Sequence, residues 1–246
     1  MLEPYDGTND SGMDLIPPDE LAQLVSRAWA GGLAVAIHAI GDRAVRSSLD
    51  AFAAAAGSSS RRPELSSRIE HAQLVAESDL PRFASLGIAA SMQPVHCTSD
   101  RDLVERWWSE RRDRSYPWQS LLLSGARLAF GSDAPVEEPS AARGLHAAVT
   151  RTRPGDPRGS FVPPQCVSLD VALTAYTEGP ARLAGLWPRL GRIAPGAIAD
   201  LVVWNVDLHA NRERVGQARP VATLVDGEIV FRRTESAETA SAGIAR

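Results

Sequence analysis

Polar residues at the ends of short apolar runs constrain the fold of this chain more than any other feature. His38 follows AVAI, His71 follows RIE in RIEHAQL, and Asp133 follows LAFGS. Each run has the length of a strand, and a helix-like segment comes after it, which is the rhythm of parallel β/α units. The carboxyl ends of such strands meet at one rim, where enzymes of this architecture place catalytic groups. The sequence therefore predicts an α/β fold in which these side chains converge.

This alternation extends over residues 1–187, which we interpret as one domain. A first helix begins at PPDE, residues 17–20, because proline and acidic residues favour a first turn, and it ends at Gly31 and Gly32. Strands are predicted at 33–37, 69–74, 88–92 and 128–131, and further helices at 42–56, 77–86 and 168–185. Residues 97–118 are rich in tryptophan and arginine, and we expect a long excursion over the strand ends that can line a substrate site.

A small β module is predicted for residues 188–233. Asp226 and Gly227 lie between the apolar runs VATLV and EIVF, and this pair favours a hairpin because a type I′ turn needs residues that tolerate positive φ. Residues 234–246 have little apolar surface to bury, so a disordered tail is expected there.

Composition excludes several classes of protein. The 246 residues are 44% hydrophobic and 23% charged, which is typical of a globular chain with a sizeable core. A net charge of −4 without a basic stripe argues against a nucleic-acid partner. The acidic, polar start is unlike a signal peptide, and no stretch has the length of a membrane span, so a cytoplasmic location is expected. Cys97 and Cys166 are expected to be free, buried thiols.

The strand-end residues have metal-binding and structural interpretations. Two imidazoles and a carboxylate, from His38, His71 and Asp133, form a donor set that suits zinc. Strand alternation places Ala36 and His38 on one face, and small residues there suit a crowded interior. Taken singly, a histidine that ends an apolar strand is more often structural, and Asp133 in GSDAP can cap a helix.

Other polar residues also have alternatives. Glu70 and His71 face opposite sides of a strand, and the histidine is the better ligand, with Glu70 a salt-bridge partner of Arg68 or another arginine. Gln93 and His96 end the third strand and are candidate substrate contacts, although His96 can equally be a solvated loop residue. His146 and His209 are expected to be structural, and the arginine runs near 111–114 to be a solvated face.

The motifs AIHAIGDRA, RIEHAQ, SMQP, FGSDAP and PGAIADLVVW, taken in this order, resemble the amidohydrolase superfamily. The resemblance is to its amidohydrolase-3 branch, with YtcJ-like and N-substituted-formamide-deformylase-like proteins, and it spans roughly residues 2–232. It implies a (β/α)8 TIM barrel with a divalent metal, usually zinc, flanked by a β-sandwich. His38 would then be the fifth-strand ligand, His71 the sixth-strand ligand, and Asp133 the eighth-strand carboxylate. In the family, that carboxylate takes a proton from metal-bound water and passes it to the leaving nitrogen.

The sequence departs from the family pattern at the first half of the barrel. Family members carry a His-x-His pair on the first barrel strand and a fourth-strand ligand that is often a carboxylated lysine. No His-x-His occurs here, and four β/α units precede the β module, whereas a whole barrel takes about 250 residues. The resemblance thus implies the C-terminal part of a TIM barrel with part of a β-sandwich.

The resulting functional expectation is a metal-dependent hydrolase of a non-peptide carbon–nitrogen bond in a small amide or formamide-like substrate. Little activity is expected from this chain alone, and a complementary N-terminal segment or a second copy would complete it. The alternative is a non-catalytic remnant or a partner subunit of a split amidohydrolase. The tryptophans near 107 hint at an apolar or aromatic substrate.

Overall fold

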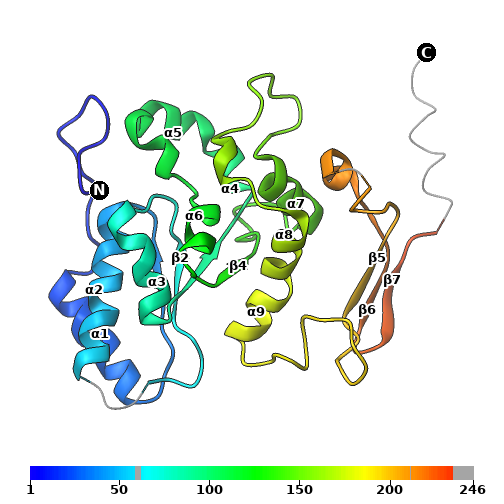
Figure 1. The fold of residues 1–246 in the computed structure, drawn as a ribbon, viewed down its shortest axis with the longest axis horizontal. Coiled ribbons are helices and arrows are strands. Elements are labelled where there is room, and N and C mark those ends of the chain that lie inside the picture. The colour runs from blue at the N-terminus through cyan, green and yellow to red at the C-terminus, as the bar shows by residue number, and fades with distance from the viewer. Residues whose placement is uncertain (59–61, 211, 235–246) are drawn as a thin grey trace.

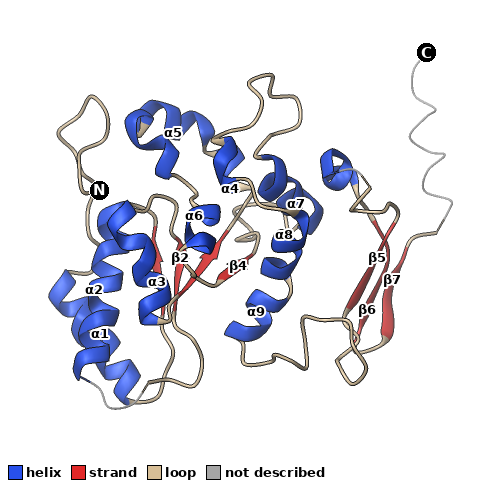
Figure 2. Ribbon diagram, viewed as in Figure 1, coloured by secondary structure: helices blue, strands red, loops and turns tan. Residues whose placement is uncertain are grey.

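The computed structural model describes residues 1–58, 62–210 and 212–234, and a parallel sheet of four strands lies at its centre (Figure 1, Figure 2). The strands are β1 (Ala36–Ala39), β2 (Arg68–His71), β3 (Ala89–Met92) and β4 (Leu128–Phe130). They pair in chain order, and each is parallel to the next. The predicted α/β class is therefore confirmed. The first strand begins at Ala36 rather than Leu33, so His38 lies within it.

Helices connect the strands and pack along one side of the sheet (Figure 2). The first, α1 (Pro18–Ala30), has acidic residues in its first turn and ends before Gly31, as predicted. The other helices outside the 97–118 segment are α2 (Asp42–Ser58), α3 (Leu80–Leu86), α6 (Trp118–Leu123), α7 (Ala141–Thr150), α8 (Leu169–Tyr176) and α9 (Glu178–Leu183). The helix predicted at 168–185 is two helices, because Thr177 leaves the helical region with φ −120° and ψ −72°. Among the described residues, no helix has the length and apolar character needed to cross a bilayer.

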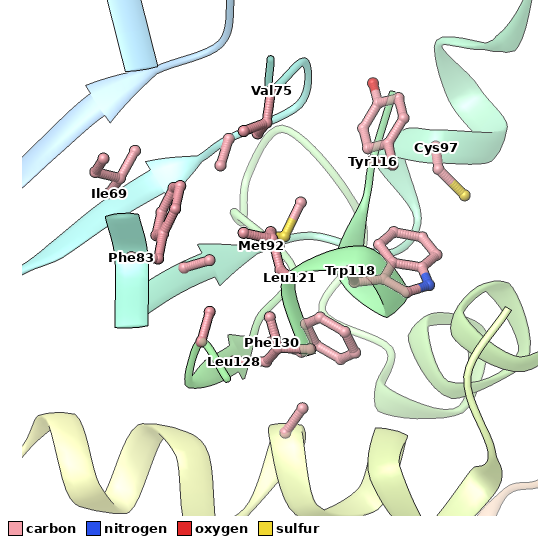
Figure 3. Close-up of a cluster of buried hydrophobic side chains, with 14 of the residues drawn as sticks. Ile69, Val75, Phe83, Met92, Cys97, Tyr116, Trp118, Leu121, Leu128 and Phe130 are labelled. Carbon is pink, nitrogen blue, oxygen red and sulfur yellow. The ribbon is translucent and has the colours of Figure 1, made fainter. Parts of the chain in front are cut away.

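Alternate residues along the strands form the core with the helices. Ile69, Met92 and Phe130 come from three neighbouring strands and are buried. They lie in one cluster with Phe83 of α3 and Leu121 of α6 (Figure 3). Burying each large apolar side chain contributes about 1.5–3 kcal/mol, so this layer is the main source of stability for the sheet.

The opposite face of the sheet is open at β1. Ala36 and His38 share this face, as alternation predicts, but both are exposed, so the crowded interior expected around them is wrong for this structure. β1 is also an edge strand: in the described part of the chain it pairs only with β2, and β4 at the other edge pairs only with β3.

The excursion at 97–118 is largely helical. It contains α4 (His96–Ser99), α5 (Arg101–Trp107) and a 3-10 helix, η2 (Ser109–Arg114). The predicted solvated arginine face is wrong for Arg111, which is 4% exposed and donates to the backbone oxygens of Glu3 and Pro4 at 2.9 and 2.7 Å. This guanidinium therefore ties the N-terminal segment to the excursion.

The C-terminal part is an antiparallel sheet of three strands, set beside α8 and α9 (Figure 1). Its strands are β5 (Leu201–Trp204), β6 (Pro220–Val225) and β7 (Glu228–Arg232), with a 3-10 helix, η4 (Arg212–Gln217), between β5 and β6. Asp226 and Gly227 turn the β6–β7 hairpin with φ of 51° and 83°, which confirms the predicted turn. Of the predicted tail, residues 235–246 lie outside the described residues.

Candidate metal centre and cavity

The carboxyl ends of the strands open into a cavity of about 770 Å³. His38, His71 and Asp133 all line it, so the three strand-end residues singled out in the sequence lie at one rim. His96, at the start of α4, lines the same cavity. The remaining lining comes mainly from the N-terminal segment and α5.

His71 reaches this rim through an unusual backbone conformation. The β1–β2 register aligns His38 with Glu70, so regular alternation would turn Glu70, and not His71, to the face of His38. His71 has φ 72°, in the left-handed region that non-glycine residues rarely adopt, and its ring centroid lies 4.5 Å from that of His38. Glu70 instead accepts a hydrogen bond from Arg68 at 2.5 Å, as one of the sequence interpretations proposed.

His96 is buried and lies between two carboxylates. Its Nε2 is 3.3 Å from Oδ2 of Asp133, and its Nδ1 is 3.7 Å from Oε1 of Glu137. It is 5% exposed, so the solvated-loop interpretation of His96 is wrong. Ligating atoms of His71, His96 and Asp133 all lie within 4.8 Å of one another, which makes His96 a further candidate ligand.

Asp133 also adopts a left-handed conformation, with φ 60°. Its cap interpretation is wrong, because α7 begins at Ala141 and is capped by Ser140, whose Oγ accepts from the backbone N–H of Arg143. Two positive-φ, non-glycine residues at one rim mark strain of the kind that clusters at functional sites.

Gln93 is placed differently from the other predicted site residues. It is buried, its Oε1 has no hydrogen-bond partner among the described residues, and it is not part of the cavity lining. The geometry therefore gives Gln93 no direct contact surface for a substrate. His209 pairs with Asp170 at 3.0 Å on the surface, and His146 packs in α7 within 3.5 Å of Thr150 Oγ1.

The electrostatics of His71 favour ligation. Burial first, and then the neighbouring imidazole of His38, lower the pKa of His71, so the ring is held neutral. Its Nδ1 is buried without a hydrogen-bond partner in the described structure. A neutral imidazole with an unmet polar atom, beside a second imidazole and a carboxylate, fits a divalent metal with nitrogen and oxygen preference. The sequence has no lysine, so a carboxylated lysine cannot come from this chain.

The structure adds lining residues that the sequence did not reveal. Glu137 and Asp100 come from the loop after β4 and the start of α5, and Tyr5 and Asp10 come from the N-terminal segment. No strand-end pattern marks these positions, because they reach the cavity only through packing between distant segments. The tryptophans near 107 were the one sequence feature that pointed to α5 as part of the cavity lining.

Comparison with known proteins gives consistent matches. The pattern of the Amidohydrolase family matches residues 1–231. The chain is 38% identical to the Protein LONG AFTER FAR-RED 3 of Arabidopsis thaliana over 93% of its length, which is 39% of that protein. It is 30% identical to YtcJ of Bacillus subtilis (strain 168), covering 95% of this chain and 44% of YtcJ. It is also 30% identical to the N-substituted formamide deformylase of Arthrobacter pascens, covering 92% of this chain and 41% of that protein.

Solved structures agree with these sequence matches. An uncharacterized metal-dependent hydrolase from Pyrococcus horikoshii OT3 has a TM-score of 0.73 and 32% identity, covering 86% of this chain and 42% of that one. Another, from Pyrococcus furiosus, has a TM-score of 0.66 and 36% identity, covering 80% and 39%. The chain thus spans about two fifths of the length of the curated relatives it matches, between 39% and 44%.

Proposed function

Because this chain belongs to the amidohydrolase family, we propose that it carries the metal-binding rim of a hydrolase that cleaves a carbon–nitrogen bond other than a peptide bond. The observation that carries the proposal is the convergence of His71, His96 and Asp133, with ligating atoms within 4.8 Å of one another. A relative named for formamide deformylation, 30% identical, supports an amide or formamide-like substrate.

Zinc is the metal we propose. Imidazole and carboxylate ligands suit zinc, and catalytic zinc sites commonly use three protein ligands and keep one position open. His71, His96 and Asp133 would supply those ligands in this chain, and His38, whose ring centroid is 4.5 Å from that of His71, would be a fourth donor. When bound, zinc would supply Lewis acidity and lower the pKa of water.

The protein's own contribution would be proton transfer and orientation. Asp133 would accept a proton from the attacking water and donate it to the leaving nitrogen, as general base and then acid. Its side chain is about one third exposed at the cavity, at 36%, so it can reach both water and substrate. Glu137, whose Oε1 lies 3.7 Å from Nδ1 of His96, would fix the orientation of that imidazole as a ligand.

Zinc affinity and hydrolysis test this proposal together. Asp133→Asn is expected to weaken zinc binding by the chain, and to abolish cleavage of an N-substituted formamide once the complementary segment is supplied. Glu138→Gln is the matched control, because Glu138 lies nearby but pairs with Arg143 on the surface at 2.7 Å. Zinc binding that is the same in both variants, measured by competition with a chromophoric chelator, would refute the metal site.

We further propose that the parallel sheet is the C-terminal part of a TIM barrel and that β5–β7 are part of a β-sandwich. Two observations support this. The face of β1 that carries His38 is exposed, and the outer edges of β1 and β4 are unpaired among the described residues. Unpaired edges of parallel strands are costly and invite pairing. Further strands, from a complementary segment or a second copy, would cover them.

Co-expression tests this architecture and the non-catalytic alternative. Little hydrolysis is expected from the 246 residues alone, and activity should increase when the part of YtcJ that this chain does not match is supplied. Zinc binding without activity in both preparations would favour a non-catalytic remnant. Full turnover by a monodisperse, monomeric chain would refute the need for further strands.

A further inference from the structure

One wall of the cavity is apolar and largely aromatic. Tyr5 contributes from the N-terminal segment, and Leu103, Val104, Trp107 and Trp108 contribute from α5 and the residue after it. Leu103 is 57% exposed although it lines a cavity beside a metal-type donor set. Large apolar side chains that stay accessible inside a cavity are typical of a surface that binds an apolar group of a ligand.

The polar part of the lining carries one sign of charge. Asp10, Asp100, Asp133 and Glu137 contribute carboxylates, and no arginine is part of the lining in the described structure. Asp100 accepts a hydrogen bond from the hydroxyl of Tyr116 at 2.7 Å, which holds its carboxylate in place. The other ionisable side chains of this lining are the imidazoles of His38, His71 and His96, and a cavity in which carboxylates outnumber basic groups attracts cations more than anions.

Two arginines of the segment that forms this wall, Arg106 and Arg111, have partners of their own. Arg106 is exposed, and its guanidinium lies 4.4 Å from the ring centroid of Trp107. Arg111 is directed to the oxygens of Glu3 and Pro4, and to Asp6 at 3.4 Å. Their charges are therefore used to hold the wall together rather than to receive an anionic ligand.

The wall is fixed from two sides. Asp6 accepts from the backbone N–H and the Oγ of Ser109, both at 2.6 Å, which joins the N-terminal segment to η2. Arg158 pairs with Asp102 at 2.5 Å and Glu105 at 2.9 Å, which holds α5 from the other side. A preorganised wall loses little conformational entropy when a ligand binds.

We propose that this cavity selects substrates that carry an aromatic or bulky apolar group and no negative charge, with cationic substrates bound best. The proposal rests on the proposed function, because it assumes that the bond to be cleaved faces the His71 and Asp133 rim. Tyr5, Leu103 and Trp107 would then be specificity-determining residues, and Asp10 and Asp100 would set the preference for charge.

Four matched probes test the selection by calorimetric titration of the full chain. They are N-benzylacetamide, its para-aminomethyl and para-carboxylate derivatives, and N-methylacetamide. The cationic probe is expected to bind at least about tenfold more tightly than the anionic one, given the uncompensated carboxylates. Loss of the phenyl ring, from N-benzylacetamide to N-methylacetamide, is expected to weaken binding roughly 10- to 100-fold.

Each titration is made once with zinc and once with a chelator. The comparison separates direct binding of the probe's carboxylate to the metal from binding of the probe to the wall. Equal or tighter binding of the anionic probe in the preparation with chelator would overturn the proposal. The titrations measure binding and do not require the chain to hydrolyse the probes. Selective binding without hydrolysis, even after the complementary segment is supplied, would therefore leave this inference intact and refute the proposed activity, and hydrolysis without selectivity would do the reverse.

Two tryptophan variants provide a matched pair. Trp107→Ala should weaken binding of N-benzylacetamide by about tenfold. Trp187→Ala should leave it unchanged, although Trp187 is also half-buried and is stacked by Arg182 at 4.5 Å, much as Trp107 is by Arg106.

Asp100→Asn should reduce the preference for the cationic probe. Leu103→Ala, at a more exposed position, repeats the test should Trp107→Ala lower the melting temperature. Unchanged affinity in Trp107→Ala and Leu103→Ala would contradict the assigned wall.

Discussion

The imidazole of His71 lies 4.5 Å from that of His38 between ring centroids, although the strand register pairs His38 with Glu70. Regular alternation would turn these two imidazoles to opposite faces of the sheet. The left-handed backbone of His71, with φ 72°, brings them together at the end of β2. The metal-type cluster therefore depends on a local backbone conformation as well as on residue identity.

This relationship predicts different effects for two neighbouring substitutions on β2. His71→Gln is expected to weaken zinc affinity by more than about 100-fold, beyond the typical cost of losing a residue that only supports a ligand. Glu70→Gln should change it little, because Glu70 is engaged with Arg68 and does not line the cavity. Chelator competition measures both constants. A larger effect for Glu70→Gln would mean that alternation, and not the turned backbone, places the ligand.

The sequence predicts much of this arrangement because strand ends in a parallel sheet share a rim. That rule draws attention to His38, His71 and Asp133, the resemblance to the family favours a metal role over a structural one, and the structure places all three around one cavity. The positive φ of His71 and Asp133 could not be predicted, since neither histidine nor aspartate demands it. His96 remained ambiguous because its burial depends on Asp133 and Glu137, which lie far along the chain.

The N-terminal segment depends on Arg111 for its position. Arg111→Met removes the donors to Glu3 and Pro4, and it should destabilise the chain by about 1.5–3 kcal/mol, the range for hydrogen bonds to a charged group. Arg112→Met is the control, because the Arg112 side chain is 58% exposed and, among the residues that the structure describes, pairs only with its neighbour Asp113 at 3.6 Å. Urea denaturation measures both. Equal midpoints for the two variants would contradict this role of Arg111.

Two helical glycines are expected to respond to alanine in opposite directions. A Cβ at Gly179 in α9 would lie 2.3 Å from the backbone oxygen of Leu128 in β4, so Gly179→Ala should destabilise by roughly 1–3 kcal/mol through overpacking. A Cβ at Gly57 in α2 meets nothing within 4 Å, so Gly57→Ala should stabilise by up to about 1 kcal/mol through helix propensity. Thermal melts of both variants test the contact between α9 and the strand.

The two thiols are expected to differ in reactivity. Cys97 is fully buried, which raises its pKa from 9.0 to about 12, whereas Cys166 is half-buried beside Ser160 at 3.7 Å. A disulfide reagent at pH 8 should therefore label Cys166 alone in the folded chain and both thiols in denaturant. Rapid labelling of Cys97 in the folded Cys166→Ser variant would contradict its burial.

The same burial predicts a loss of stability in alkali. Between pH 9 and about 12 the unfolded chain releases the Cys97 proton while the folded chain retains it. The folded state then binds more protons, so the free energy of unfolding falls as pH rises above 9. The thiol makes no such contribution below pH 9, where both states are protonated. Between pH 8 and pH 10, the urea midpoint should decrease less for Cys97→Ala than for the parent chain. An equal decrease in both proteins would show that this thiol is not the group that titrates.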